Sequence, residues 1–216
     1  MIAALANAPT TTPAIISIFG SALPPDARAT TSTHATVITE PANAAAVPTL
    51  SLKVDLPAQF FRMTTMLGQI LGDTVSARNV VDSVTRSLAA VRELTKNAAR
   101  HRTVWVSDTD PLIIIGGGSF LTELIAIAGG ENIFASIAGP SATVSVESVV
   151  ASNPDIILGS RHTVDHILAA PGWRATTAAK SRHVLEGDSY LMGRPSVRMG
   201  EAARQLARLI HPELFR

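Results

Sequence analysis

Hydrophobic positions recur at helical spacing in the middle of the chain. From Asp73 to about residue 99, apolar side chains follow steps of three and four, which places them on one face of a helix. Asp73 stands where it would cap the N-terminus of this helix. A helix of about 25 residues is roughly 38 Å long and could join two lobes. A shorter helix is predicted just before it, from Pro57 to Leu71. The apolar face comprises Ala77, Val80, Val84, Leu88, Val91 and Leu94.

After residue 100, short apolar runs alternate with helical patterns. Strands are predicted over 103–106, 112–115, 156–158 and 183–185. One helix is expected to open at 116–119 and end at Gly129–Gly130, and another to start at Ser145. Two more are expected over 164–169 and 196–210. This alternation predicts an α/β fold with a mostly parallel sheet, covered by helices on both faces.

The first part of the chain is poor in charge and rich in Pro, Ser and Thr. Its apolar runs at 14–19, 35–38 and 50–54 predict short strands joined by loops. The first 25 residues lack a basic segment and contain four prolines, so we predict no signal peptide within this chain. Glu123 and three consecutive glycines interrupt the apolar stretch 111–130, which we therefore interpret as buried rather than membrane-spanning.

The composition of the chain argues against several classes of function. The chain has 216 residues, of which 46% are hydrophobic, and its 18 basic and 17 acidic side chains leave a net charge of +1. This is the composition of a globular protein. Because binding to nucleic acid requires clustered Lys and Arg, the charge balance argues against it. Cysteine is absent, which excludes disulfides, cysteine-based zinc sites and thiol nucleophiles.

The segment Gly116-Gly117-Gly118-Ser119 is a candidate ligand site. It reads as the start of a helix, whose exposed backbone N–H groups can bind an anion. The alternative is a tight strand-to-helix turn that Ser119 caps. The segment is not a dinucleotide fingerprint, because Leu121 occupies the place of the third glycine. It also lacks the Gly-x-Ser-x-Gly elbow of a catalytic serine, so we predict no enzyme activity.

Three further groups of side chains are candidates. Arg194 and Arg198 could bind anionic oxygens with their guanidinium groups, or form salt bridges with Asp188 or Glu201. Tyr190 could stack on a planar ligand or pack in the interior. His162, Asp165 and His166 have the spacing of a helical metal pair, but such a set is frequent by chance on an exposed helix. We predict no metal site and no intrinsic cofactor.

Several phrases in the second half resemble one known family. They include Gly118-Ser119-Phe120-Leu121, Ala128-Gly129-Gly130-Glu131-Asn132, Val144-Ser145-Val146-Glu147, Asn153-Pro154-Asp155 and Arg194-Pro195-Ser196. In order and spacing over residues 103–216, these phrases are similar to those of the periplasmic substrate-binding proteins of ABC importers for iron-siderophores, haem and cobalamin. In that family a rigid helix joins two lobes.

The resemblance implies a two-lobed fold and a set of site residues. Residues 1–56 would form a partial N-terminal lobe, 57–100 the linking helices, and 101–216 a complete C-terminal lobe. Gly117, Gly118, Ser119, Tyr190, Arg194 and Arg198 would contact the ligand. Glu147, in the first turn of its helix, would dock onto arginines of the permease, with Glu40 as a weak candidate for its N-terminal counterpart. Trp173 would pack in the core of the C-terminal lobe.

The function that this resemblance implies is capture of a metal chelate outside the cytoplasm and its delivery to an ABC permease and its ATPase. An iron-siderophore is the first choice, because paired arginines suit an anionic ligand, and haem and cobalamin follow. Two alternatives stay open. One is a cytosolic α/β enzyme or anion-binding module that holds a phosphate at Gly116–Ser119, and the other is a truncated fragment that binds no ligand.

Overall fold

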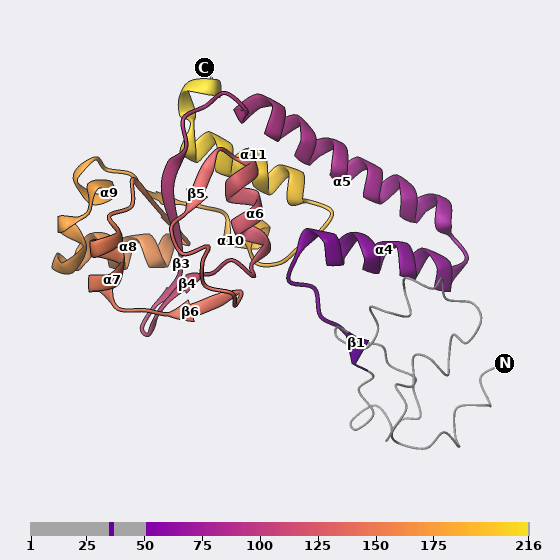
Figure 1. Cartoon of the computed structure of the whole chain (residues 1–216), viewed down its shortest axis with the longest axis horizontal. Helices are drawn as coiled ribbons and strands as arrows, with labels where there is room; N and C mark the ends of the chain where they lie inside the picture. The colour runs from indigo at the N-terminus through magenta and orange to yellow at the C-terminus, as the bar shows by residue number, and fades with distance from the viewer. Residues whose placement is uncertain (1–34, 37–50, 216) are drawn as a thin grey trace.

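The computed structural model describes residues 35–36 and 51–215. Two short strands, Ala35–Thr36 (β1) and Ser51–Leu52 (β2), pair antiparallel within the predicted strands 35–38 and 50–54. The predicted strand 14–19 and Glu40 lie outside the described residues. Two helices follow, Pro57–Leu71 (α4) and Thr74–Thr95 (α5), and they pack against each other as a hairpin (Figure 1).

The two helices start where the sequence predicts. Proline, which fits the first helical turn, opens α4. The Asp73 carboxylate accepts a hydrogen bond from the Ser76 N–H at 2.9 Å and caps α5. The end of α5 differs from the prediction. The helix stops at Thr95, whose buried hydroxyl donates to the Ile127 carbonyl at 2.7 Å. Thr95 thus takes the inward position expected for Leu94, which is 39% exposed.

The remainder of the chain builds a six-stranded sheet with helices on both sides. The strand order is β6-β4-β3-β7-β8, and β5 pairs with β3. The strands are His101–Thr109 (β3), Leu112–Ile115 (β4), Gly130–Asn132 (β5), Ser141–Thr143 (β6), Ile156–Gly159 (β7) and Val184–Glu186 (β8). The α-helices are Phe120–Ile127 (α6), Val146–Ser152 (α7), Arg161–Ala169 (α8), Thr177–Lys180 (α9), Ser189–Met192 (α10) and Met199–Ile210 (α11). The described residues also form the 3₁₀ helices Pro171–Ala175 (η3) and Pro212–Phe215 (η4).

The α/β class is confirmed, and the sheet is more mixed than predicted. β3 pairs parallel with β5 and β7, and β7 pairs parallel with β8. However, β4 folds back on β3 as an antiparallel hairpin, and β6 continues that pattern. The hairpin turn is at Asp110–Pro111, where proline cannot donate to the sheet ladder. The last helix begins at Met199, three residues after the predicted Ser196.

Side chains alternate between the two faces of the sheet and build two cores. In the first core, Trp105 and Leu158 face α5, α6 and α11. In the second core, Val104 and Ile157 face α7, α8 and α9. Trp173 is 4% exposed and packs in the second core, as predicted. Figure 1 shows the helices on opposite sides of the strands. The prediction of a sheet covered on both faces is therefore confirmed.

Helix α5 packs against the last helix, α11. It runs along α11, and Gly200 of α11 approaches it so closely that a methyl group there would lie 2.0 Å from the Ser87 Oγ. Val84, Leu88 and Val91 of α5 are buried in the first core. The long helix and the sheet therefore form one packed unit. The division of the chain at residues 56 and 100 stays a prediction.

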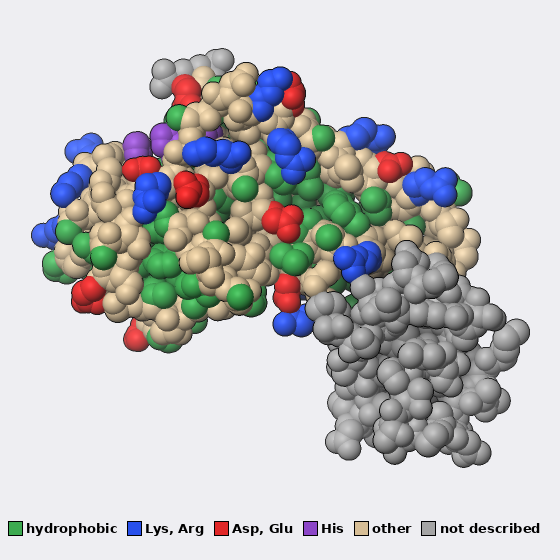
Figure 2. Space-filling view, in the orientation of Figure 1, with side chains coloured by type: hydrophobic (Ala, Val, Ile, Leu, Met, Phe, Trp, Pro, Cys, Tyr) green, Lys and Arg blue, Asp and Glu red, His purple; other side chains and the backbone are tan. Residues whose placement is uncertain are grey.

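Within the part of the chain that the structure describes, no helix combines the length and apolarity needed to cross a membrane. Figure 2 shows acidic and basic side chains interspersed on the visible face, without a large field of one sign.

Candidate ligand-binding site

A cavity of about 290 Å³ lies at one edge of the sheet. Its walls come from β3, from the turn that opens α6, from the segment after β7, and from α10. In α/β sheets, ligands bind in the crevice outside the carboxyl ends of the strands. Ser160 directly follows β7, and Ser189 follows β8 closely, so this cavity occupies that position. The lining residues are Trp105, Val106, Ser107, Ile115, Ser119, Phe120, Leu121, Pro140, Ser141, Ser160, Ser189, Met192 and Gly193.

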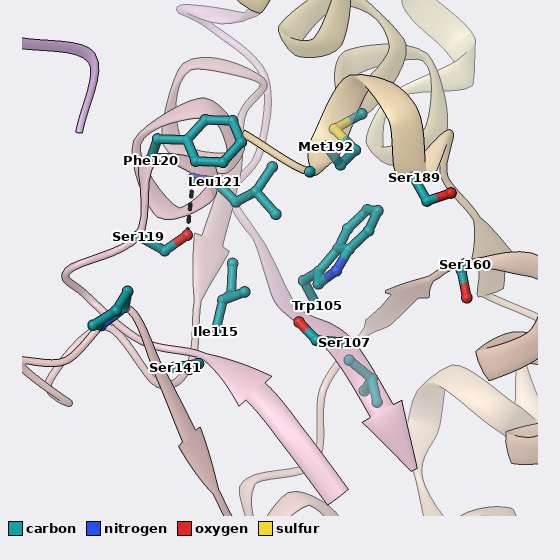
Figure 3. A pocket seen from close by; sticks show the side chains of 13 residues that line it. Trp105, Ser107, Ile115, Ser119, Phe120, Leu121, Ser141, Ser160, Ser189 and Met192 are labelled. Atoms are coloured by element: carbon teal, nitrogen blue, oxygen red, sulfur yellow. Dashed lines mark hydrogen bonds between the residues drawn. The ribbon is translucent and has the colours of Figure 1, made fainter. Parts of the chain in front are cut away.

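The floor of the cavity is apolar. Trp105, Phe120 and Met192 are each at most 5% exposed, and they belong to the first core. Figure 3 shows Leu121, Met192 and Ser107 around the Trp105 ring. An aromatic floor of this kind binds planar or apolar ligand surface with little loss of side-chain entropy, because core packing already fixes the rings.

Five serine hydroxyls supply the polarity of the cavity. Ser119 is buried and Ser160 is half-buried, and both accept hydrogen bonds from backbone N–H groups of the helices that they cap. Ser107, Ser141 and Ser189 are exposed. A serine hydroxyl donates one hydrogen bond and accepts others, so these side chains can pair with either a donor or an acceptor of a ligand.

The backbone N–H groups of the turn before α6 are engaged within the protein. Those of Gly116, Gly117 and Gly118 donate to carbonyl oxygens of the 137–140 loop, at 3.0, 2.6 and 3.1 Å. The Ser119 N–H donates to the Gly116 carbonyl at 3.2 Å, and the Phe120 N–H to the Asp55 carbonyl at 2.8 Å. Because anion binding at a helix N-terminus needs free N–H groups, the phosphate site that we considered at this turn has no backbone donors.

The structure separates the residues that were predicted at this turn. Ser119 lines the cavity, and its hydroxyl accepts from the Leu121 N–H at 3.2 Å, which confirms the predicted cap. Gly117 and Gly118 lie outside the lining of the cavity. The carbonyl of Ala135 approaches Gly117 so closely that a methyl group there would lie 2.2 Å from it. Glycine at this position is thus required by packing. A ligand contact by either glycine stays a prediction.

The two arginines lie beyond the lining of the cavity. Arg198 forms a two-pronged salt bridge with Glu201, with Nε and Nη2 each 2.8 Å from a carboxylate oxygen. This pairing raises the pKa of Arg198 and lowers that of Glu201. The salt-bridge alternative is therefore confirmed for Arg198. Arg194 is exposed and follows Gly193, which lines the cavity. Its contact with a ligand stays a prediction.

Tyr190 follows Ser189, which lines the cavity, but lies outside the lining itself. Its side chain is 93% exposed, so the predicted alternative of packing in the interior is wrong. Asp188 orients this segment, because its carboxylate accepts from the Tyr190 N–H at 2.8 Å and caps α10. The stacking role predicted for this exposed ring stays a prediction.

Glu147 is exposed in the first turn of α7, away from the cavity lining. Hydrogen bonding to its own backbone N–H and to the Ser145 hydroxyl lowers the pKa of the Glu147 carboxyl. Ser145 caps the helix through the Ser148 N–H at 3.2 Å, as predicted. An exposed carboxylate with a lowered pKa is suited to contact a basic partner. The docking role stays a prediction.

The histidine candidates do not assemble a metal site. His162 and His166 both lie on α8, and His166 Nδ1 is within hydrogen-bond distance of the Thr109 hydroxyl. Within the described ranges, no group of three His, Asp or Glu side chains is arranged to hold a metal ion.

Sequence reasoning missed most of the cavity. Trp105, Ser107, Phe120, Ser160 and Met192 were not predicted as ligand contacts. A signal for some of them existed, because Ser107 stands near the end of a predicted strand and Ser160 follows another. The rule that ligands bind at the carboxyl ends of parallel strands would have selected both.

Comparison with known proteins places this geometry in a family. A model of the family described as "Periplasmic binding protein" matches residues 21–191, most of the chain. The chain belongs to the periplasmic binding protein family. Membership implies an extracytoplasmic protein, and it confirms the predicted resemblance. Family members and relatives are substrate-binding proteins and not enzymes, which confirms that no catalysis is expected.

The curated relatives of this periplasmic binding protein include vitamin B12-binding proteins. The chain is 27% identical over 133 residues to a vitamin B12-binding protein of Vibrio parahaemolyticus, an alignment covering 61% of this chain and 48% of that protein. It spans about half the length of the curated relatives it matches.

Solved structures share its fold. An ABC transporter substrate-binding protein from Listeria monocytogenes has a TM-score of 0.74 at 17% identity, covering 81% of this chain and 72% of the other. An Fe³⁺-hydroxamate transport protein from Saccharomonospora viridis has a TM-score of 0.65 at 16% identity, covering 74% and 58%.

Proposed function

We propose that this periplasmic binding protein captures a metal chelate outside the cytoplasm and delivers it to an ABC permease and its ATPase. The observation that carries this proposal is the cavity with an aromatic floor at the carboxyl-end edge of the sheet. It lies where α/β proteins bind ligands, in a chain of a substrate-binding family. The chelate is cargo, so the protein needs no cofactor of its own.

The cargo is drawn from cobalamin, ferric siderophores and haem. The likeness of this chain to a vitamin B12-binding protein supports cobalamin. Its fold similarity to an Fe³⁺-hydroxamate transport protein supports a siderophore. A Trp105–Phe120 floor suits the apolar surface of all three. Because Arg198 is paired with Glu201 and lies outside the lining, the argument that placed anionic siderophores first is weaker.

Limited closure is expected on binding. Ligand capture between two lobes requires them to move relative to each other. Here α5 is packed along α11, with Gly200 against Ser87. The connection therefore resists bending, and a permease would distinguish loaded from empty protein by small shifts rather than by a large hinge motion.

A fluorescence titration tests binding. Trp105 lines the cavity, whereas Trp173 lies in the opposite core. A Trp173→Phe variant therefore leaves Trp105 as the reporter. We expect saturable one-to-one quenching by cyanocobalamin, ferrichrome or hemin, after correction for ligand absorption, and a matching calorimetric stoichiometry. If none of these binds to protein whose circular dichroism shows it folded, the proposed function is wrong.

A transport assay tests docking by Glu147. In vesicles that contain the cognate permease, Glu147→Lys is expected to lower uptake while leaving the chelate affinity unchanged, since Glu147 lies outside the cavity. Glu131→Lys is the control, because Glu131 is also an exposed carboxylate, on β5. Equal effects of the two variants on uptake would contradict a specific docking role.

A further inference from the structure

The described residues that line the cavity include no ionisable side chain. Among the thirteen described residues that line it, none is Lys, Arg, His, Asp or Glu. The polar groups of these side chains are the serine hydroxyls and the indole N–H of Trp105, and the remaining side chains are apolar, apart from glycine. An ion leaving water for this wall would find no opposite charge to compensate its lost hydration.

Three of the charged side chains next to the wall are engaged within the protein, whereas Arg194, which follows Gly193, is exposed. Arg161, which follows Ser160, lies 3.9 Å from a Glu186 carboxylate oxygen. Arg198 is held by Glu201 through two hydrogen bonds. The Asp188 carboxylate accepts two backbone N–H groups of α10. Recruiting any of these three engaged groups to a ligand would break an existing contact.

Three hydroxyls remain available for a ligand. Ser107, Ser141 and Ser189 are exposed residues of the lining, open to solvent or to a ligand. They come from β3, from β6 and from α10, so they surround the cavity on different sides. Because each hydroxyl both donates and accepts, they match amide and hydroxyl groups, which also do both.

We propose that this wall binds an uncharged face of the chelate that carries amide or hydroxyl groups, and that the protein selects electrically neutral chelates over anionic ones. This inference rests on the function proposed above. It reverses the expectation, drawn from Arg194 and Arg198, that the ligand is anionic. The aromatic floor supplies contact area, and the serines supply direction and selectivity.

The test compares two neutral and two anionic probes by calorimetry. Cyanocobalamin and ferrichrome are neutral, whereas ferric enterobactin and hemin carry catecholate or propionate charge. At least one neutral probe is expected to bind at least about tenfold more tightly than either anionic probe. Its Kd is expected to change less than about twofold between roughly 0.05 and 0.5 M sodium chloride, since no charge is paired on binding.

Variants assign the effect to the wall. Ser107→Ala with Ser189→Ala is expected to weaken binding of the neutral probe about tenfold or more, from two lost hydrogen bonds. Ser83→Ala, an exposed serine of α5, is the matched control and is expected to change nothing. Arg194→Ala with Arg198→Ala is likewise expected to leave the affinity unchanged.

The outcomes separate the two proposals. Tighter binding of an anionic probe, with an affinity that falls with salt and with loss of the arginines, overturns the neutral-ligand inference and leaves the proposed function standing. Equal affinity of the serine variant and the wild type also overturns it. Failure of all four probes to bind overturns the proposed function itself.

Discussion

Gly187 lies directly against the Trp105 indole. A methyl group added at Gly187 would come within 2.7 Å of ring carbon Cζ3 and 2.8 Å of Cη2. The Gly187 N–H also donates to the Gly159 carbonyl at 2.9 Å, which fixes the backbone there. Since the backbone cannot retreat without losing this bond, Gly187 sets the position of the ring that forms the cavity floor.

Gly187→Ala is therefore expected to displace Trp105 toward the cavity. The variant should lose about 1–3 kcal/mol of unfolding free energy, as overpacked cores do, and chelate affinity should fall more than stability alone explains. Calorimetric Kd and the wavelength of Trp105 emission in a Trp173→Phe background measure both effects. Gly172→Ala is the control, because the nearest atom would lie at 3.3 Å, in a side chain that can move. An unchanged emission spectrum would contradict the prediction.

The contact of Gly200 with Ser87 predicts a coupled pair. Gly200→Ala alone should destabilise the protein by about 1–3 kcal/mol, because its methyl group would lie 2.4 Å from the Ser87 Cβ. Ser87→Gly removes that atom. A double-mutant cycle by urea denaturation should therefore give a favourable coupling energy of about 1 kcal/mol or more. Purely additive losses would show that α5 and α11 are less tightly joined than their packing indicates.

The cap formed by Asp73 is expected to make the stability of the protein depend on pH. Hydrogen bonds from the Ser76 N–H and then its hydroxyl lower the pKa of the Asp73 carboxyl. A carboxyl whose pKa is lowered by folding stabilises the protein above its unfolded pKa, and this contribution disappears as the pH falls through the folded value. Thermal melts between about pH 7 and 3 should therefore show a smaller acid loss in Asp73→Asn, which keeps a cap without a titrating charge. Identical pH profiles would contradict this role.

Replacement of His211 is expected to destabilise the protein strongly. The His211 side chain is 1% exposed, with Nδ1 3.0 Å from a Glu213 carboxylate oxygen and Nε2 3.3 Å from the Gly129 carbonyl oxygen. His211→Ala would leave a cavity and an unpaired carbonyl, so a loss of about 2–4 kcal/mol is expected by urea denaturation. Glu213→Ala should cost less, since Glu213 is at the surface. The reverse order of the two losses would refute this account.

Local signals allowed the sequence to predict much of the fold. Asp73, Ser119 and Ser145 cap helices as expected, since an N-cap is decided within a few residues. The strands β5 and β6 were not predicted, because three residues such as Gly130–Asn132 show no period and gain their pairing from β3 and β4. Contacts distant in sequence decided these two strands.

The candidate site was predicted less well for the same reason. Arg194 and Arg198 have a suggestive spacing, but Glu201 lies one turn from Arg198 and takes its guanidinium. The Gly116–Ser119 turn has the sequence of an anion site, but the 137–140 loop folds over it and accepts its N–H groups. In both cases the motif alone does not reveal the protein group that takes up its hydrogen-bonding capacity.

The closed hydrogen bonding of that turn has a consequence for a protein that works outside the cytoplasm. A helix N-terminus with free N–H groups beside the cavity would bind small inorganic anions such as phosphate or sulfate. A turn whose N–H groups already donate to protein carbonyls leaves no free backbone donor for these ions. Small inorganic anions therefore find no competing backbone site next to the cavity lining.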